Sequence, residues 1–103
     1  MSEESAQLVA IRKVIEDTLA SDFKNVKILR VMVDRDVDFD GDHVLNVEVV
    51  FEGKPLHIDA RMISGAIRHV RPHLEKLGEK AFPLMSFVSR RDASNMGMAL
   101  GSL

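Results

Sequence analysis

The residues best suited to chemistry lie in one acidic run near the middle of the chain. Aspartates alternate with other residues at Asp36, Asp38, Asp40 and Asp42, and Gly41 precedes the last of them. Close carboxylates repel one another unless a cation or an arginine lies between them, and carboxylate oxygens are ligands that Ca²⁺ prefers. The sequence therefore predicts a candidate divalent-cation site formed by these four aspartates.

This run matches only the first half of an EF-hand calcium loop. An EF-hand places oxygen ligands on alternate residues, a glycine at the sixth position and a bidentate glutamate at the twelfth. Counted from Asp36, the sixth residue is Gly41, but the twelfth is Val47 and Glu48 comes one residue late. The flanking residues have the composition of strands, whereas an EF-hand needs helices. The run is either a weaker cation site or a solvated acidic tip that discourages pairing with other chains.

Two histidines form a second candidate pair. His69 and His73 are four residues apart, a spacing that presents two imidazoles to one zinc ion on a helix. No third ligand is evident near them in the sequence, and the general-base glutamate of a His-Glu-x-x-His motif is absent. The alternative is a solvated polar stripe that continues through Lys76 and Lys80.

Positive charge gathers in the second part of the chain. Residues 1–60 carry a net charge of −6, whereas residues 61–103 carry +4. Arg61, Arg68 and Arg71 are spaced to follow one flank of a helix. Such a surface fits phosphates, an acidic partner or the acidic run of a second copy. Nucleic-acid binding usually also needs aromatic platforms, and the chain has five phenylalanines but no tryptophan or tyrosine.

The sequence offers little for catalysis, and we expect neither enzyme activity nor a cofactor. It contains no cysteine nucleophile, no serine in a Gly-x-Ser-x-Gly turn, and only dispersed glycines. No apolar run approaches the ~20 residues that span a bilayer. The first residues lack the features of a signal peptide, so the expected location is cytoplasmic.

A predicted β-hairpin, Val26 to Glu52, positions the acidic run. Both of its arms are rich in β-branched and aliphatic residues. A three-residue loop places Val33 opposite Val47, which turns the aliphatic side chains of both arms toward the core, and it puts Gly41 at a left-handed position. A two-residue turn would instead place Val33 opposite Glu48 and bury a charge.

The other face of this hairpin is the predicted contact surface. A fully solvated face alternates more cleanly to polar residues, so its aliphatic side chains indicate contact with a protein partner or a second copy. The alternative is that scattered surface aliphatics need no partner. Arg35 falls on the core-facing side, away from the aspartate row. The candidate partner-binding residues are Ile28, Met32, Val44, Val50, Arg68 and Arg71.

Two amphipathic helices are predicted on either side of the hairpin. Apolar residues recur at steps of three and four over residues 6–20 and 60–77. Asp59 is a suitable N-cap for the second helix, and Gly78 is a suitable end. Pro72 lies inside that helix and predicts a kink or a break there, because proline removes a backbone donor.

A short third strand, residues 82–89, completes the expected fold. A right-handed crossover would place it beside the first arm. The expected fold is a single α+β domain over residues 1–92, with element order α-β-β-α-β, a two-layer sandwich and an antiparallel sheet of strand order 2-1-3. Both helices lie on one sheet face. Residues 93–103 have no periodicity and are expected to be a flexible tail.

This order of elements resembles the type II K-homology arrangement of ribosome-binding factor A. In that family a hairpin is followed by a helix, a kink, a second helix and a short strand after a proline. Here Arg68–Pro72, Leu74–Leu77 and Phe82–Phe87 occupy comparable places, and the resemblance covers about residues 6–89 at the level of topology. No Gly-x-x-Gly clamp occurs. The resemblance implies an RNA- or ribosome-binding module.

The leading functional hypothesis is a small interaction or regulatory protein. It would act by protein–protein contact through the open face of the sheet, with a partner or as a homodimer. RNA binding and divalent-cation binding at the acidic tip are the two alternatives.

Overall fold

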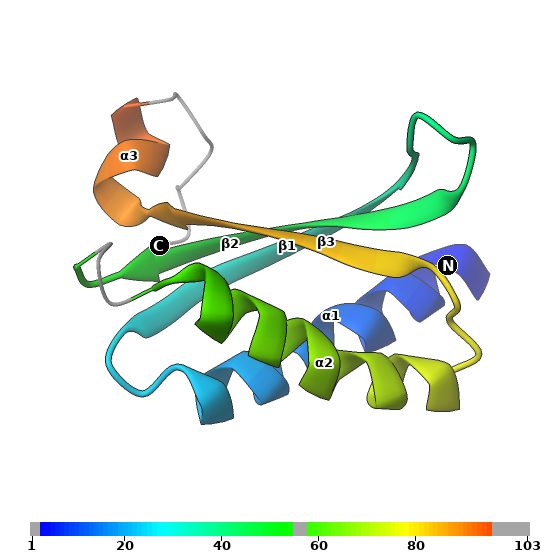
Figure 1. The fold of residues 1–103 in the computed structure, drawn as a ribbon, viewed down its shortest axis with the longest axis horizontal. Coiled ribbons are helices and arrows are strands. Elements are labelled where there is room, and N and C mark those ends of the chain that lie inside the picture. The colour runs from blue at the N-terminus through cyan, green and yellow to red at the C-terminus, as the bar shows by residue number, and fades with distance from the viewer. Residues whose placement is uncertain (1–2, 55–57, 96–103) are drawn as a thin grey trace.

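The computed structural model describes residues 3–54 and 58–95. They form a small α+β domain with a three-stranded mixed sheet and three helices (Figure 1). The predicted order α-β-β-α-β is confirmed, with one more helix after the last strand. The elements are α1 (Glu3–Asp22), β1 (Lys27–Val37), β2 (His43–Glu52), α2 (Ala60–Lys76), β3 (Phe82–Ser89) and α3 (Arg90–Asn95).

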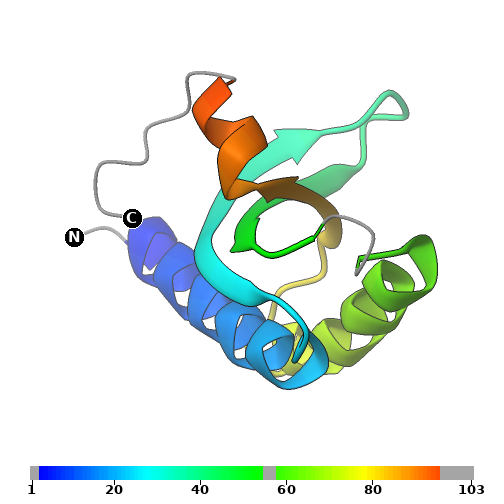
Figure 2. The ribbon, with the colours of Figure 1, turned by 90° about the vertical axis from the view of Figure 1, so that its left-hand side faces the viewer.

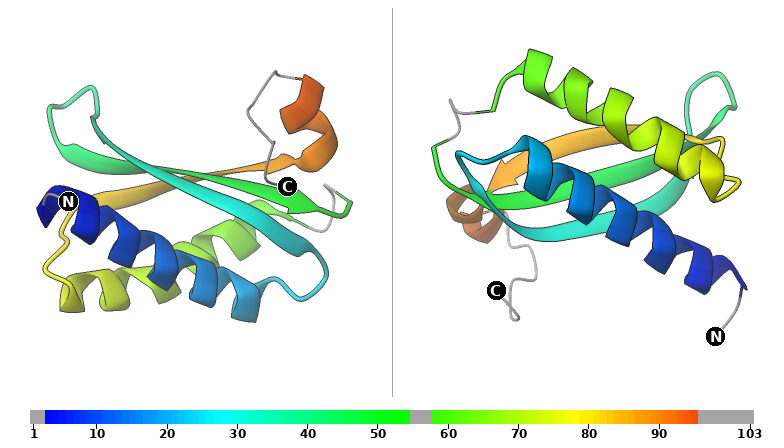
Figure 3. Two further views of the ribbon diagram at one scale, coloured as in Figure 1. Left: turned by 180° about the vertical axis from the view of Figure 1, so that it is seen from behind. Right: turned by 90° about the horizontal axis from the view of Figure 1, so that it is seen from below.

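The helices cover the sheet unequally. α1 and α2 lie side by side on one face (Figures 1 and 3), as predicted. α3 rises on the opposite side, beyond the end of β3, where it contacts β2 and β3 (Figure 2). Two long helices therefore cover one face of the sheet, and among the described elements α3 covers the other face at one end.

The core lies between the sheet and the layer formed by α1 and α2. Its helical members follow the three- and four-residue spacing seen in the sequence, which turns one stripe of each helix inward. Just after α1, the ring of Phe23 packs with its centroid 5.0 Å from that of Phe87 in β3. The buried cluster consists of Ile11, Ile15, Leu19, Phe23, Val31, Leu45, Val47, Val49, Ala66, Val70 and Leu74.

The hairpin has the predicted register and loop. Val33 pairs with Val47, as the three-residue loop requires. Asp38 N–H donates to Asp42 O at 2.9 Å, and Gly41 N–H donates to Asp38 O at 3.1 Å. Gly41 has a φ of +84°, a left-handed conformation that glycine adopts without a steric penalty. The turn chemistry readable in the sequence therefore set the register of the hairpin from the loop back to the pairing of Arg30 with Val50.

An irregularity at the start of β1 changes which side chains face the core. Ile28 pairs with Phe51 but Arg30 pairs with Val50, so Leu29 is an extra residue at a β-bulge. A bulge of one residue reverses the alternation on one side of it. Ile28 therefore packs partly against the core cluster, and its predicted place on the open face is wrong.

The predicted strand order 2-1-3, antiparallel throughout, is also wrong. The observed order is β1-β2-β3, with β2 antiparallel to β1 and parallel to β3. A strand in the middle of a sheet needs apolar side chains on both faces, whereas charges suit an edge. Six of the ten residues of β2 are buried, against one of eleven in β1, so the more apolar arm takes the central position.

Helix α2 is continuous through Pro72, so a break at that residue is not observed, and the alternative of a kink stays a prediction. Asp59 caps its start as predicted, because its carboxylate accepts the N–H of Met62 at 2.8 Å. Gly78, with a φ of +80°, ends it as predicted. The N–H groups of Gly78 and Glu79 donate to the carbonyls of Glu75 and Leu74, which is the Schellman arrangement of a helix C-terminus.

The chain beyond β3 begins with the short helix α3, whose residue Ala93 is fully buried. The N–H of Asp92 donates to Ser89 Oγ at 3.1 Å, which starts this helix. Residues 93–95 of the predicted tail therefore belong to α3, and residues 96–103 lie outside the described part of the chain.

Two glycines allow a test of these turns. Gly53 has a φ of +147°, and a Cβ added there would lie 2.8 Å from Cγ1 of Val26, whereas a Cβ added at Gly41 meets nothing within 4 Å. Gly41→Ala should cost about 1–2 kcal/mol from backbone strain alone, and Gly53→Ala should cost more because a clash is added. Urea denaturation measures both; equal losses would contradict this account.

Candidate functional site

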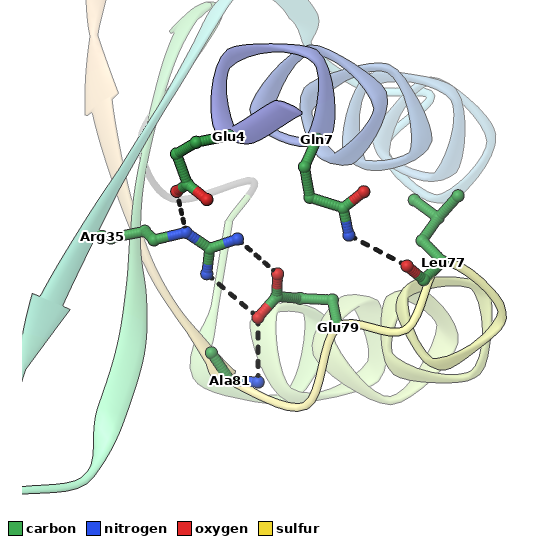
Figure 4. A network of polar contacts seen from close by, with 6 residues as sticks. All are labelled: Glu4, Gln7, Arg35, Leu77, Glu79 and Ala81. Carbon is green, nitrogen blue, oxygen red and sulfur yellow. Dashed lines mark hydrogen bonds and ion pairs between the residues drawn. The ribbon is translucent and has the colours of Figure 1, made fainter. Parts of the chain in front are cut away.

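The guanidinium of Arg35 joins three separate parts of the chain (Figure 4). Its Nη1 and Nη2 donate to the two carboxylate oxygens of Glu79 at 3.1 and 2.7 Å, and its Nε donates to Glu4. Nearby, the side-chain amide of Gln7 donates to the carbonyl of Leu77 at 2.9 Å. The N-terminal part of α1, the second half of β1 and the segment after α2 therefore meet at one point.

The backbone conformation at the end of α2 determines the position of Glu79. In a Schellman arrangement the residue after the glycine usually makes an apolar contact with the last helical turn. Here that residue is a glutamate, and its side chain is only 8% exposed. Its carboxylate is satisfied by Arg35 and by the N–H of Ala81, 3.2 Å from Oε2. Because a buried carboxylate needs such partners, the loop after α2 is fixed to β1.

The hydrogen bonds of this network favour the charged forms of Arg35 and Glu79. The hydrogen bonds from Arg35 hold the pKa of Glu79 below its ordinary value of 4.5, although burial opposes the shift. The hydrogen bond to Glu79 and the one to Glu4 raise the pKa of Arg35, again against burial. A general base works best with a pKa near the operating pH. The network is therefore suited to holding elements together and poorly suited to proton transfer.

Glu79→Gln should lower the free energy of unfolding by about 2 kcal/mol, because it leaves Arg35 without its bidentate partner. The folded-state pKa of Glu79 lies below its unfolded value. The contribution of the ionised Glu79 carboxylate to the free energy of unfolding is therefore complete above about pH 4.5. It is lost as the pH falls through the folded-state pKa. As the pH falls through this range, the Glu79→Gln variant should lose less stability than the parent protein. Urea titrations at several pH values measure this, with exposed Glu75→Gln as the matched control.

A result in which Glu79→Gln and Glu75→Gln have the same effect, and the same acid dependence, would contradict the structural role of the pair.

Three of the four predicted metal-ligating aspartates come together at the hairpin tip. Among the described residues, the carboxylates of Asp38, Asp40 and Asp42 offer ligand atoms that all lie within 4.8 Å of one another. Asp38 Oδ1 also accepts the N–H groups of Asp40 and Asp42, each at 2.9 Å. One of the three carboxylates therefore closes the turn. Ca²⁺ takes six to eight oxygens, so three carboxylates fill part of such a shell, and cation binding stays a prediction.

The fourth predicted ligand, Asp36, is engaged elsewhere. It stands in β1, where one oxygen accepts the N–H of Val37 and the other accepts the amide of Asn46, both at 2.8 Å. The first of these bonds and then the second lower the pKa of Asp36. Asp36 therefore links the two strands of the hairpin and is not part of the cluster at its tip.

The turn predicts different effects for two neighbouring aspartates. Asp38→Ala removes the acceptor for two backbone N–H groups and should cost about 1 kcal/mol. Asp40→Ala removes an exposed carboxylate and should change stability by less than about 0.5 kcal/mol. Urea denaturation of both variants measures the difference. Equal costs would show that the Asp38 hydrogen bonds do not stabilise the hairpin.

The aliphatic members of the predicted contact surface are mostly covered. Val50 is fully buried and Val44 is 5% exposed, while Ile28 packs partly against the core. Only Met32 remains half-buried on the open face. The sequence did not identify Leu84, on the same face of β3, which is 45% exposed. Assigning the side chains of β3 to the two faces of the sheet would have identified Leu84. The alternation in the sequence does not show which face of β3 points inward.

The two predicted basic contact residues lie on α2, away from this face. Arg68 and Arg71 are both exposed. The guanidinium carbon of Arg71 lies 5.2 Å from the centroid of the Phe82 ring, at cation–π distance. The histidines predicted as a pair are also exposed on α2, and His69 Nδ1 lies 2.8 Å from Asp22 Oδ2 on α1.

The uncovered part of the open face forms a shallow groove. Figure 1 shows α3 and the hairpin tip rising on this side at the two ends of the sheet, with no other described helix or strand between them. The groove between the strands has a volume of about 440 Å³. Its charged members are Asp34 and Glu48, and Leu84 is its exposed apolar member. The residues lining it are Asp34, Asn46, Val47, Glu48, Leu84, Met85 and Ser86.

Comparison with known proteins adds no family to this picture. No protein-family model matches the chain, and no curated protein matches it. Among the helices in the described residues, none has the length and apolar character needed to cross a membrane.

Proposed function

We propose that this chain is a small protein-binding module that holds a basic segment of a partner protein on the open face of its sheet. The observation that carries the proposal is the groove between α3 and the hairpin tip. There the carboxylates of Asp34 and Glu48 stand beside the exposed side chain of Leu84. A surface with an apolar centre and charged surroundings is typical of a binding site.

Charge defines the partner. Both charged side chains that line the groove are acidic, and the hairpin tip at one end adds Asp38, Asp40 and Asp42. A field of one sign attracts and orients a partner of the opposite sign. Lys and Arg side chains would therefore meet Asp34 and Glu48, and an apolar residue between them would cover Leu84.

The same charge argues against the symmetric homodimer considered from the sequence. A twofold contact through the open face brings the same patch of both copies together. Asp34 and Glu48 of one copy would then face the same carboxylates of the other, and unpaired like charges in an interface cost free energy. A distinct basic partner fits this face better than a second copy does.

The sheet topology favours an extended partner segment. β3 pairs with β2 on one side and is an edge strand among the described strands. An extended peptide can add to such an edge by main-chain hydrogen bonds, with alternate side chains set into the neighbouring surface. Leu84 stands on the open-face row of β3 and is 45% exposed, whereas the ring of Phe82 at the start of that strand lies against Arg71 of α2. Leu84 would lie next to the alternate side chains of the added strand.

A soluble peptide in which lysine alternates with leucine tests the proposal. In an NMR titration the shifted amides should be those of Asp34, Glu48 and Leu84. Glu48→Lys should weaken binding about 10-fold or more, because a repulsive contact replaces an attractive one. Glu75→Lys, the same charge change on α2, is the matched control. Equal weakening by both variants, or shifts that avoid the groove, would reject the proposal.

RNA binding is a second candidate. The observations that favour it are the element order α-β-β-α-β and the exposed arginines of α2. The second helix of the K-homology arrangement has no counterpart among the described residues, because α2 is one continuous helix. K-homology domains clamp the nucleic-acid backbone with a Gly-x-x-Gly loop, which this chain lacks. Any contact with phosphates would therefore depend on Arg68 and Arg71.

For this second candidate, a single-stranded RNA oligonucleotide should bind with an affinity that falls steeply as salt rises. The double variant Arg68→Glu with Arg71→Glu should abolish that binding, whereas Arg12→Glu on α1 should reduce it only slightly. Fluorescence anisotropy at two salt concentrations measures both effects. Absence of binding at low salt, or equal losses in the two variants, would reject RNA as the ligand.

A further inference from the structure

A hollow where the C-terminal part of α1 meets α2 gathers two imidazoles and two carboxylates. Asp17 and Asp22 come from α1, His69 and His73 come from α2, and the volume of the hollow is about 360 Å³. We propose that it binds Zn²⁺, or a divalent transition metal of similar preference, through His69 and His73.

The continuity of α2 makes the two imidazoles neighbours. Pro72 lies between them in the sequence, and a break at that residue would have turned His73 away from His69. The helix instead runs from Ala60 to Lys76 without interruption. Side chains four residues apart on a helix have Cβ atoms about 5–6 Å apart. Both histidines are exposed, so an ion reaches them from solvent.

Asp22 orients the first ligand. A carboxylate oxygen can only accept a hydrogen bond, so the 2.8 Å contact between His69 Nδ1 and Asp22 Oδ2 places the proton on Nδ1. The lone pair of His69 Nε2 is then available to a metal. Metal-bound histidines almost always donate their other ring N–H to a carboxylate or a carbonyl in this way. The contact with Asp22 is the part of a metal site that the sequence does not reveal.

Asp17 offers a further donor. Zn²⁺ accepts imidazole nitrogen and carboxylate oxygen in a tetrahedral arrangement, and Asp17 lines the same hollow. Among the described residues, the three-ligand group whose atoms lie within 4.8 Å of one another is the aspartate cluster at the hairpin tip. Zinc binding at the histidines therefore requires side chains that line the hollow to move.

The two candidate cation sites differ in chemistry. Imidazole suits Zn²⁺, whereas a cluster of carboxylates suits Ca²⁺. The histidine hollow lies in the helical layer on the other side of the sheet from the groove. A zinc ion there would join α1 to α2, and its binding is independent of any partner in the groove.

Titration of the whole chain with ZnCl₂, followed by NMR of the histidine side chains, tests the proposal. Micromolar Zn²⁺ should shift the imidazole signals of His69 and His73, and the same concentration of Ca²⁺ should leave them unchanged. His73→Ala should weaken zinc binding at least 10-fold. Asp22→Asn should weaken it about 10-fold, with the melting temperature of the metal-free protein nearly unchanged. His43→Ala, at the start of β2, is the matched control.

Equal weakening by His43→Ala and His73→Ala would overturn the proposal, as would zinc-dependent shifts confined to Asp38–Asp42. An Asp22→Asn variant that binds zinc like the parent would remove the orienting role of that carboxylate. Because His73 is exposed, its replacement should leave the fold intact, and circular dichroism of the metal-free variants checks this.

Discussion

The bidentate contact between Arg35 and Glu79 fixes how the two layers of this domain meet at one end. Arg35 stands on the core-facing side of β1, two residues beyond Val33, at the point where the apolar layer ends. Glu79 is largely buried, so its carboxylate has little access to water and depends on the guanidinium for compensation. Glu4 completes the guanidinium's contacts from α1. Without this pairing, the converging end of α1, β1 and the segment after α2 would contain an uncompensated buried charge.

The choice of central strand also affects the arrangement of charges on the sheet. β2 is apolar on both faces, and its position between β1 and β3 leaves the charged strand at an edge. Because Val31 and Val33 face the core, alternation along β1 places Asp34 and Asp36 on the side that α1 and α2 do not cover. With α3 at one end of that side and the hairpin tip at the other, the groove between them is acidic and partly apolar. The proposed binding of a basic protein segment follows from this placement.

The helical layer and the open face carry different chemistry. On the open face, fixed carboxylates attract positive charge without offering a soft ligand. In the helical layer, His69 and His73 offer imidazoles, and Asp22 on α1 constrains the ring of one of them. Carboxylates alone and imidazoles supported by a carboxylate select different ions. The small domain thus separates a surface for association from a hollow suited to a transition metal.

The sequence by itself determined the two long helices, the three strands and the register of the hairpin near its loop. Apolar spacing set the helices, and Gly41 set the three-residue loop, because these depend on residues close together in the chain. The caps at Asp59 and Gly78 could also be predicted, because each depends on residues close together in the chain. A proline inside a helix is also a local signal, but it did not break this helix, because α2 continues through Pro72.

Only the tertiary structure decided which strand is central, which face Ile28 takes after the bulge at Leu29, and which residues meet across layers. The contact between Arg35 and Glu79 joins positions 44 residues apart, and that between His69 and Asp22 joins positions 47 apart. Such pairs leave no periodic signal in a single sequence. They arise when whole elements pack to bury apolar surface, and the polar side chains that remain near the boundary then find their partners.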